Sequence, residues 1–152
     1  MSDDRPRRML PELTERSRFF WEAGRQGRLL VLRCQRCGYY LHPPGPLCPV
    51  DHSKDLAPEA VSGRGRVASF TVDHHRWLPA PEPPYVIALV ELAEQEALRL
   101  TTNLVGCPPG EVRIGMEVEV TFDHQPDPEG QGDVWLPMFR PLQDDRGDHG
   151  EG

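Results

Sequence analysis

The second half of the chain carries apolar residues with the spacing of β-strands. In residues 118–122, valine and phenylalanine alternate with glutamate and threonine, which is the pattern of a strand with one buried face. Apolar runs of strand length recur on both sides, and the polar segment 93–97 between two of them predicts a hairpin. The other strands are expected at residues 66–72, 85–92, 98–105 and 135–139.

Five strands between residues 66 and 139, with no helical pattern among them, indicate a mainly β fold. Closing such a sheet on itself hides its edges, so we expect a five-stranded Greek-key barrel of the OB type. Pro137 lies in the last apolar run and has no amide donor, which predicts an edge position for that strand.

The first half of the chain has a different pattern. Residues 13–23 have helical spacing and Gly24 is expected to stop the helix, whereas the run 29–32 predicts a strand leading into Cys34. Residues 54–60 are interpreted as a linker. The expected organisation is a disordered segment 1–12, a helix and zinc ribbon at 13–58, the barrel at 59–143 and a disordered acidic tail at 144–152.

Composition narrows the classes of partner. Acidic residues outnumber basic ones by 24 to 17 and the net charge is -7, which argues against nucleic acid as the main partner. No apolar run approaches the roughly 18 residues that a membrane helix needs, and no secretory signal is evident. We therefore expect a cytoplasmic protein with no membrane partner.

Three cysteines stand at metal-ligand spacing. Cys34 and Cys37 form a Cys-x-x-Cys turn followed by Gly38, and Cys48 begins a second such turn. Structural zinc takes four ligands, mostly thiolate and imidazole, and less often carboxylate. The fourth ligand can be Asp51, at the position of the missing cysteine, or His52 beside it. The pattern predicts structural zinc and leaves these two alternatives open.

The chain shows no catalytic constellation of its own. His74 and His75 are adjacent, so on a strand they would face opposite sides, and Cys107 lies in a Pro-Gly loop without an evident base. We expect no catalytic residue. Clustered aromatic and proline-rich segments instead predict an interface with a partner chain, and its residues are expected to be Phe19, Phe20, Trp21, Trp77, Leu78 and Tyr85.

Short motifs spread along residues 17–142 resemble one family. The matching pieces, in chain order, are Phe20-Trp21, Gly27, Leu29, Arg33 to Gly38, Pro43-Pro44, Cys48-Pro49, Gly63 to Val67, Pro84 to Leu92, Leu104 to Gly106 and Ile114 to Val120. This set resembles the proteins known as domain of unknown function 35 (DUF35), which join a rubredoxin-like zinc ribbon to an OB fold. The family pattern has a fourth cysteine where this chain has Asp51.

The resemblance implies an accessory subunit of an acyl-CoA enzyme in steroid or lipid metabolism. The expected partner is a thiolase-like subunit, either a thiolase or a lipid-transfer-protein-type aldolase that releases a fragment by a retro-aldol reaction. A hotdog-fold hydratase is a further possible partner, and a heterotetramer of two plus two subunits is the expected assembly. Acyl-CoA would be a ligand of the complex, with no residue assigned to it. The alternatives are a stand-alone acyl-CoA-binding protein and a single-stranded nucleic-acid-binding OB fold.

Overall fold

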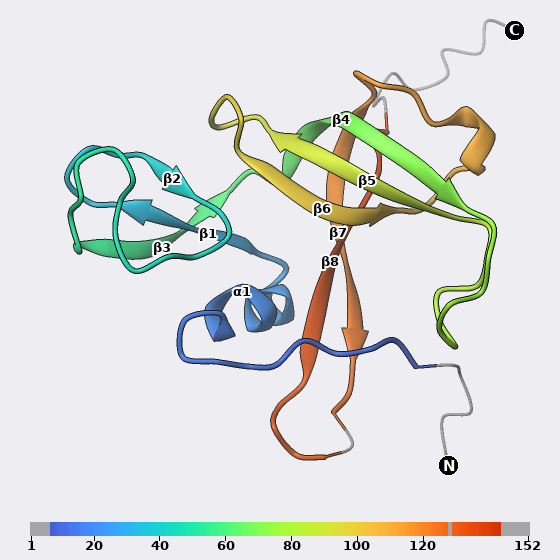
Figure 1. Cartoon of the computed structure of the whole chain (residues 1–152), viewed down its shortest axis with the longest axis horizontal. Coiled ribbons are helices and arrows are strands. Elements are labelled where there is room, and N and C mark those ends of the chain that lie inside the picture. Colours follow the sequence, from blue (N-terminus) through green and yellow to red (C-terminus); the bar gives the residue numbers. More distant parts are fainter. Residues whose placement is uncertain (1–6, 128, 144–152) are drawn as a thin grey trace, which may run out of the picture.

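The computed structural model describes residues 7–127 and 129–143. A small three-stranded sheet and then a five-stranded barrel follow helix α1 along the chain. In space, α1 packs against both of them (Figure 1). This arrangement confirms the predicted mainly β architecture of a short helix, a ribbon and a barrel. No helix in the described ranges has the length and apolar character needed to cross a membrane.

The N-terminal helix is shorter than its sequence pattern predicts. Helix α1 covers Arg18–Glu22 and continues as a 3-10 turn over Ala23–Gln26. The turn ends at Gly27, whose φ of 68° is the left-handed conformation in which a helix commonly stops. The expectation of a stop at Gly24 is therefore wrong. Gly24 lies so close to Phe122 and Trp135 that an added Cβ would overlap both side chains.

The ribbon sheet contains β1 (Leu29–Cys34), β2 (Tyr40–Leu41) and β3 (Leu56–Val61) in the order β2-β1-β3. The hairpin of β1 and β2 carries the Cys-x-x-Cys turn at its tip, as predicted. Residues 56–60 are not a linker, because β3 pairs with the whole length of β1. The ribbon therefore extends to Val61, and only residues 62 and 63 separate it from the first barrel strand.

The barrel closes in the order β4-β5-β6-β8-β7. Each predicted strand is present within a few residues of its expected ends, and a 3-10 turn, Pro109–Glu111, lies in the connection between β6 and β7. The barrel strands are β4 (Arg64–Asp73), β5 (Tyr85–Leu92), β6 (Arg99–Leu104), β7 (Glu117–Gln125) and β8 (Val134–Pro141).

Strand β8 is not an edge, contrary to the prediction from Pro137. It pairs along its length with β7 and at one position with β6. The carbonyl groups of Pro137 and Phe139 both face β6, since the Thr102 hydroxyl donates to the first at 2.9 Å and the Val105 amide to the second at 2.8 Å. The nitrogen of Pro137 therefore also faces β6. Because β8 pairs with β6 only further on, at Phe139, no backbone hydrogen bond is lost and a proline is tolerated at 137.

Alternation along β5 explains how the barrel is filled. Its even-numbered residues, from Val86 to Leu92, are buried and its odd-numbered residues are only partly buried. These inward side chains meet Phe139 from β8, which is fully buried. Phe20 of α1 joins the same core together with Leu29 and Val31 of β1. One continuous core therefore connects the ribbon, the helix and the barrel.

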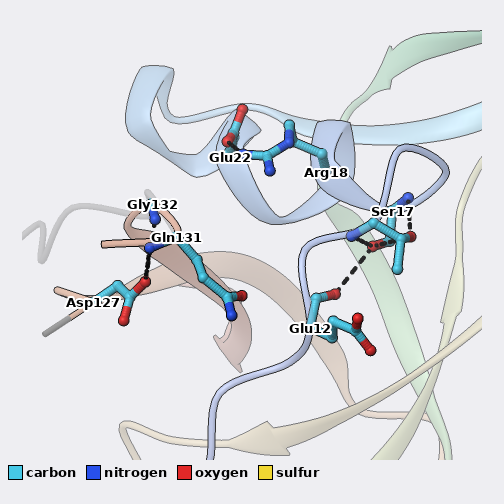
Figure 2. A network of polar contacts seen from close by, with 8 residues as sticks. Glu12, Ser17, Arg18, Glu22, Asp127, Gln131 and Gly132 are labelled. Atoms are coloured by element: carbon cyan, nitrogen blue, oxygen red, sulfur yellow. Dashed lines mark hydrogen bonds and ion pairs between the residues drawn. The ribbon is translucent and has the colours of Figure 1, made fainter. Parts of the chain in front are cut away.

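The described part of the N-terminal segment runs from Arg7 without regular structure and lies against the barrel. The Arg8 guanidinium donates to Asn103 Oδ1 at 2.8 Å and lies 3.2 Å from Asp123 Oδ2. Figure 2 shows the next part of the segment, where the Ser17 hydroxyl donates to the Glu12 carbonyl at 3.3 Å before α1 begins. Residues 1–6 and 144–152, at the predicted disordered ends, lie outside the described residues.

The loop between β7 and β8 faces the start of α1 (Figure 2). The Asp127 carboxylate accepts backbone amides from Glu129, Gln131 and Gly132 and so holds the turn together. On the helix side, Arg18 and Glu22 form an ion pair with 2.7 Å between Nη1 and Oε1.

Candidate metal centre and docking surface

Two similar turns bring four potential ligands together at the tip of the ribbon. The ligand atoms of Cys34, Cys37, Cys48 and Asp51 all lie within 4.8 Å of one another. Cys34 ends β1, and its carbonyl accepts the amide of Gly38, four residues on, at 3.0 Å. In the second turn the Cys48 carbonyl accepts the amide of His52, also four residues on, at 2.9 Å.

This repeat shows how the two candidate fourth ligands are placed relative to the cysteines. Asp51 occupies the place in the second turn that Cys37 occupies in the first, and His52 occupies the place of Gly38. His52 and Gly38 both have positive φ, 59° and 81°. His52 is exposed and is not part of the cluster, whereas Asp51 is. The left-handed residue turns the chain, and Asp51 is the residue that lies beside the three cysteines.

The spacing of the four atoms fits a tetrahedral ion. With zinc–sulfur bonds of about 2.3 Å, ligand atoms at the corners of a tetrahedron lie about 3.8 Å apart. Cys37 Sγ and Cys48 Sγ are 3.6 Å apart, and Cys34 Sγ lies 3.6 Å from Asp51 Oδ1. Three sulfurs with one carboxylate oxygen favour zinc over the hard ions calcium and magnesium, which prefer all-oxygen sites.

Backbone amides aim at the cluster and favour its anionic forms. The Ser53 amide donates to Asp51 Oδ1 at 2.9 Å and lowers the pKa of that carboxyl group. The Cys37 amide similarly lowers the pKa of the Cys34 thiol. The Tyr39 amide lowers the pKa of Cys37, but burial and the neighbouring thiols raise it more strongly, to about 11. Four acidic groups packed this closely have the donor set of a cation site.

The predicted interface residues come together only in part. Phe20 and Trp21 from α1, Leu78 from the loop between β4 and β5, and Tyr85 from β5 line one pocket of about 310 Å³. Phe19 lines a different pocket, beside Trp135. Two segments about sixty residues apart in sequence thus form one largely apolar surface, called the aromatic pocket below.

The predicted interface residues differ in how far their side chains are exposed to solvent. Trp77 is 70% exposed and Leu78 41%, so both project from the molecule. Phe20 is 6% exposed and belongs to the core, so the free chain does not offer it to a partner. Phe20 is buried because α1 packs against β8 of the barrel as well as against β1 of the ribbon.

A hydrogen-bonded network holds the loop that carries Trp77. The Tyr85 hydroxyl donates to Asp73 Oδ2 at 2.9 Å, and the other carboxylate oxygen accepts the His75 amide at 2.9 Å. The His75 ring lies edge to face with Trp77, with 4.4 Å between centroids. Burial, followed by the hydrogen bond to Asp73, raises the pKa of Tyr85. The exposed Trp77 is therefore attached to an ordered base.

Sequence reasoning missed other residues that line the aromatic pocket. Ile87 lies two residues after Tyr85 on β5 and shares its face, a relation that strand periodicity could have revealed. Met138 comes from β8, and Arg8 and Met9 come from the segment expected to be disordered. No local pattern indicates these three, because tertiary packing alone brings them to the pocket.

The groups considered for catalysis stay apart. His74 and His75 are exposed in the loop just after β4. Cys107 is half-buried against the barrel core, and burial raises the pKa of its thiol. Within the described residues, Cys107 has no hydrogen-bonded histidine or carboxylate to act as its base.

Comparison with known proteins extends this picture. Residues 21–57 match the profile "ChsH2, rubredoxin-like zinc ribbon domain", and residues 58–123 match "ChsH2, C-terminal OB-fold domain". A chain of the solved structure "Ltp2-ChsH2(DUF35) aldolase" is 44% identical, with a TM-score of 0.75. That alignment covers 87% of this chain and 98% of the other.

Curated relatives include both short and long proteins. A "DUF35 domain-containing scaffold protein" of Methanocaldococcus jannaschii is 38% identical over 62% of this chain and 67% of its own length. A "Probable enoyl-CoA hydratase alpha subunit" of Thermomonospora curvata is 44% identical over 90% of this chain. The "3-oxo-4,17-pregnadiene-20-carboxyl-CoA hydratase alpha subunit" of Mycobacterium tuberculosis is 38% identical over 78% of it.

The chain spans only 40% and 37% of the length of these two hydratase subunits, so it corresponds to one part of each. It covers nearly the whole of the aldolase chain that it matches. The ribbon and the barrel match consecutive profiles of one family over residues 21–123. The chain therefore belongs to the DUF35/ChsH2 family of zinc-ribbon and OB-fold proteins.

Proposed function

We propose that this chain is a non-catalytic accessory subunit of a thiolase-fold acyl-CoA enzyme, of the steroid side-chain aldolase or thiolase type. The observation that carries the proposal is the 44% identity to nearly the entire length of a chain in an Ltp2-ChsH2 aldolase. Burial and the nearby Glu111 carboxylate raise the pKa of the Cys107 thiol, which disfavours a nucleophilic thiolate and supports a role without chemistry of its own. The partner would supply the catalytic groups, in an assembly of two plus two subunits.

Cys34, Cys37, Cys48 and Asp51 are the residues that would hold a structural zinc ion. All four positions of the tetrahedron would be filled by protein, so the ion would join the two turns and activate no water. A single ion would thereby connect the end of β1 to the loop before β3.

The aromatic pocket, together with the exposed Trp77 next to Leu78, is the surface that would meet the partner. Large aromatic residues are favoured anchors in interfaces, and the ordered loop beneath Trp77 limits the entropy lost on docking. The proline-rich segment, with prolines at 79, 81, 83 and 84, adds stiffness for the same reason. From this surface the chain would complete the entrance to the partner's acyl-CoA site.

The test is co-purification of the tagged chain with each thiolase-like subunit encoded by its host. We expect one of these subunits to be retained and the doubly substituted Trp77→Ser, Leu78→Ser chain to lose it. Ile114→Ser is the matched control, because Ile114 is 72% exposed but is not part of the aromatic pocket. Retention of no thiolase-like subunit, or turnover of an acyl-CoA by the chain alone, would contradict the proposal.

A hydratase subunit is the second candidate partner, favoured by the two hydratase alpha subunits among the relatives. The same purification distinguishes it, because the retained protein would then be a hydratase. Nucleic acid is less favoured, since arginines on the barrel are engaged by carboxylates. The nitrogen–oxygen distances are 3.7 Å for Arg66, 3.0 Å for Arg76, 3.4 Å for Arg99 and 3.2 Å for Arg140.

A further inference from the structure

The turn between β5 and β6 of the barrel holds the ribbon at two points. The Gln95 side chain donates from Nε2 to the Tyr40 carbonyl at 3.0 Å and accepts the Tyr40 amide at Oε1 at 2.9 Å. Next to it, the Glu94 carboxylate accepts the Ser62 hydroxyl at 2.8 Å and the Ser62 amide at 3.3 Å. Two neighbouring side chains of the barrel thus bind the ribbon at Tyr40 and its connection to the barrel at Ser62.

The positions of Tyr40 and Ser62 show which parts of the ribbon these contacts hold. Tyr40 lies in β2, the outer strand of the ribbon sheet, which pairs with β1 at only two positions. The Gln95 amide binds the free edge of β2 in the way that another strand would. Ser62 lies in the short connection between β3 and β4, where the ribbon joins the barrel. The two contacts therefore fix both the far edge of the ribbon and its point of attachment.

On its other side, β2 is attached to the metal-binding turn. The Tyr39 carbonyl accepts the Cys34 amide at 2.8 Å, and Tyr40 follows Cys37 by only three residues. Arg33 reinforces this side, because it donates to the Gly38 carbonyl at 2.9 Å and its guanidinium lies 4.5 Å from the centre of the Tyr40 ring. Strand β2 thus lies between the candidate zinc ligands and Gln95.

We propose that Glu94 and Gln95 form a clamp that couples the metal centre to the barrel by holding the β2 edge of the ribbon against it. This inference rests on the proposed zinc site. While the four ligands share an ion, the turn at Cys37 holds β2 in the position that Gln95 binds. Without the ion, two paired positions are too few to hold β2, since so short a hairpin has little stability of its own. Tyr40 then leaves Gln95, and the β2 edge of the ribbon is no longer held against the barrel, while β1 stays packed in the common core.

The experiment measures amide hydrogen exchange residue by residue in the full chain. The variants are Gln95→Ala and the control Glu96→Ala, which alters the same turn at an exposed residue outside the clamp. Zinc content is measured first, and the exchange is then compared before and after removal of zinc with EDTA. The reporters are the amides of Tyr40 in the ribbon, Leu98 in the turn and Val90 in the barrel core.

In the zinc-loaded chain, Gln95→Ala should speed exchange at Tyr40 about tenfold, the order expected for losing two hydrogen bonds of modest net strength. Val90 should be unchanged in this variant, and Glu96→Ala should match the unmodified chain at all three positions. Removing zinc should speed exchange at Tyr40 and also at Leu98, whose amide bonds to the Gln95 carbonyl at 3.3 Å. In Gln95→Ala the Leu98 response to zinc removal should vanish.

The possible failures are distinguishable. Unchanged exchange at Tyr40 in Gln95→Ala would overturn the clamp. If the chain holds zinc and its removal leaves Leu98 unaffected, the coupling is wrong while the metal site stands. If the purified chain holds no zinc, the metal site and the coupling both fall. Equal acceleration at Tyr40 and Val90 would also overturn the clamp, because it would indicate general destabilisation. Retention of the partner subunit is measured separately, so its failure bears only on the proposed function.

Discussion

Replacing Asp51 by asparagine tests the identity of the fourth ligand with little change of shape. The asparagine side-chain oxygen can still accept the Ser53 amide, now 2.9 Å from Asp51 Oδ1, so the second turn should keep its conformation. What is lost is the negative charge that lies 3.6 Å from the Cys34 sulfur. Asp51→Asn therefore removes an anionic ligand while leaving the local hydrogen bond in place.

The size of the effect follows from the place of Asp51 in the tetrahedron. Removing a group that only supports a metal ligand typically weakens binding 10- to 100-fold. Loss of a ligand itself should cost more than about 100-fold, which corresponds to about 2.8 kcal/mol. At a fixed excess of zinc, the free energy of unfolding should fall by a similar amount. The reason is that zinc binding stabilises the folded chain in proportion to the logarithm of the zinc affinity.

Competition for zinc with a chromophoric chelator measures this change, and two further variants serve as controls. Asp51→Cys completes a second Cys-x-x-Cys turn and should bind zinc at least as tightly as the unmodified chain. His52→Gly should also keep its affinity, since glycine suits the φ of 59° at this position. The reasoning is refuted if Asp51→Asn binds zinc normally while His52→Gly loses it, because His52 would then be the ligand.

Two other substitutions probe the packing of the helix and the ribbon. Gly24→Ala should lower the free energy of unfolding by about 1–3 kcal/mol, as overpacking does, because its methyl group would overlap Phe122 and Trp135; a denaturant titration giving a more stable protein would contradict this. Burial lowers the pKa of His42 to about 4, below about 6.5 in the unfolded chain, so the unfolded state binds more protons between these values and stability falls as pH falls from 6.5 to 4. Between pH 7 and pH 4, the free energy of unfolding of His42→Gln should therefore fall by up to about 3 kcal/mol less than that of the unmodified chain. Urea titrations measure this, and an equal fall in both proteins would show that His42 is not the group responsible.

Much of the fold could be predicted because its signals are local. Strand β5 occupies residues 85–92 as its apolar run indicates, and the cysteine pair lies at the tip of a hairpin. Period-two alternation and Cys-x-x-Cys spacing reflect constraints within a few residues, so they can be read along the chain. The same holds for the absence of a long apolar helix in the described ranges.

Other features depended on contacts between distant segments. The sequence correctly indicates that Pro137 has no amide to donate. Only the closed barrel shows that this position faces β6. Gly24 looked like a helix stop, yet its role is to let the helix approach β7 and β8. In both cases the residue type is explained by a neighbouring segment that is distant in sequence: β6 for Pro137, and β7 with β8 for Gly24.

By itself, the sequence determined the helix, the strand before Cys34, the five barrel strands and three of the candidate metal ligands, but not strand β3. Only the tertiary structure placed Asp51 rather than His52 beside the cysteines, placed Phe20 in the core, and brought Trp21 to the same pocket as Leu78. The physical reason is the same throughout. Spacing along the chain limits the local backbone and the face on which a side chain lies, whereas burial and ligand geometry depend on which distant surface packs against that face.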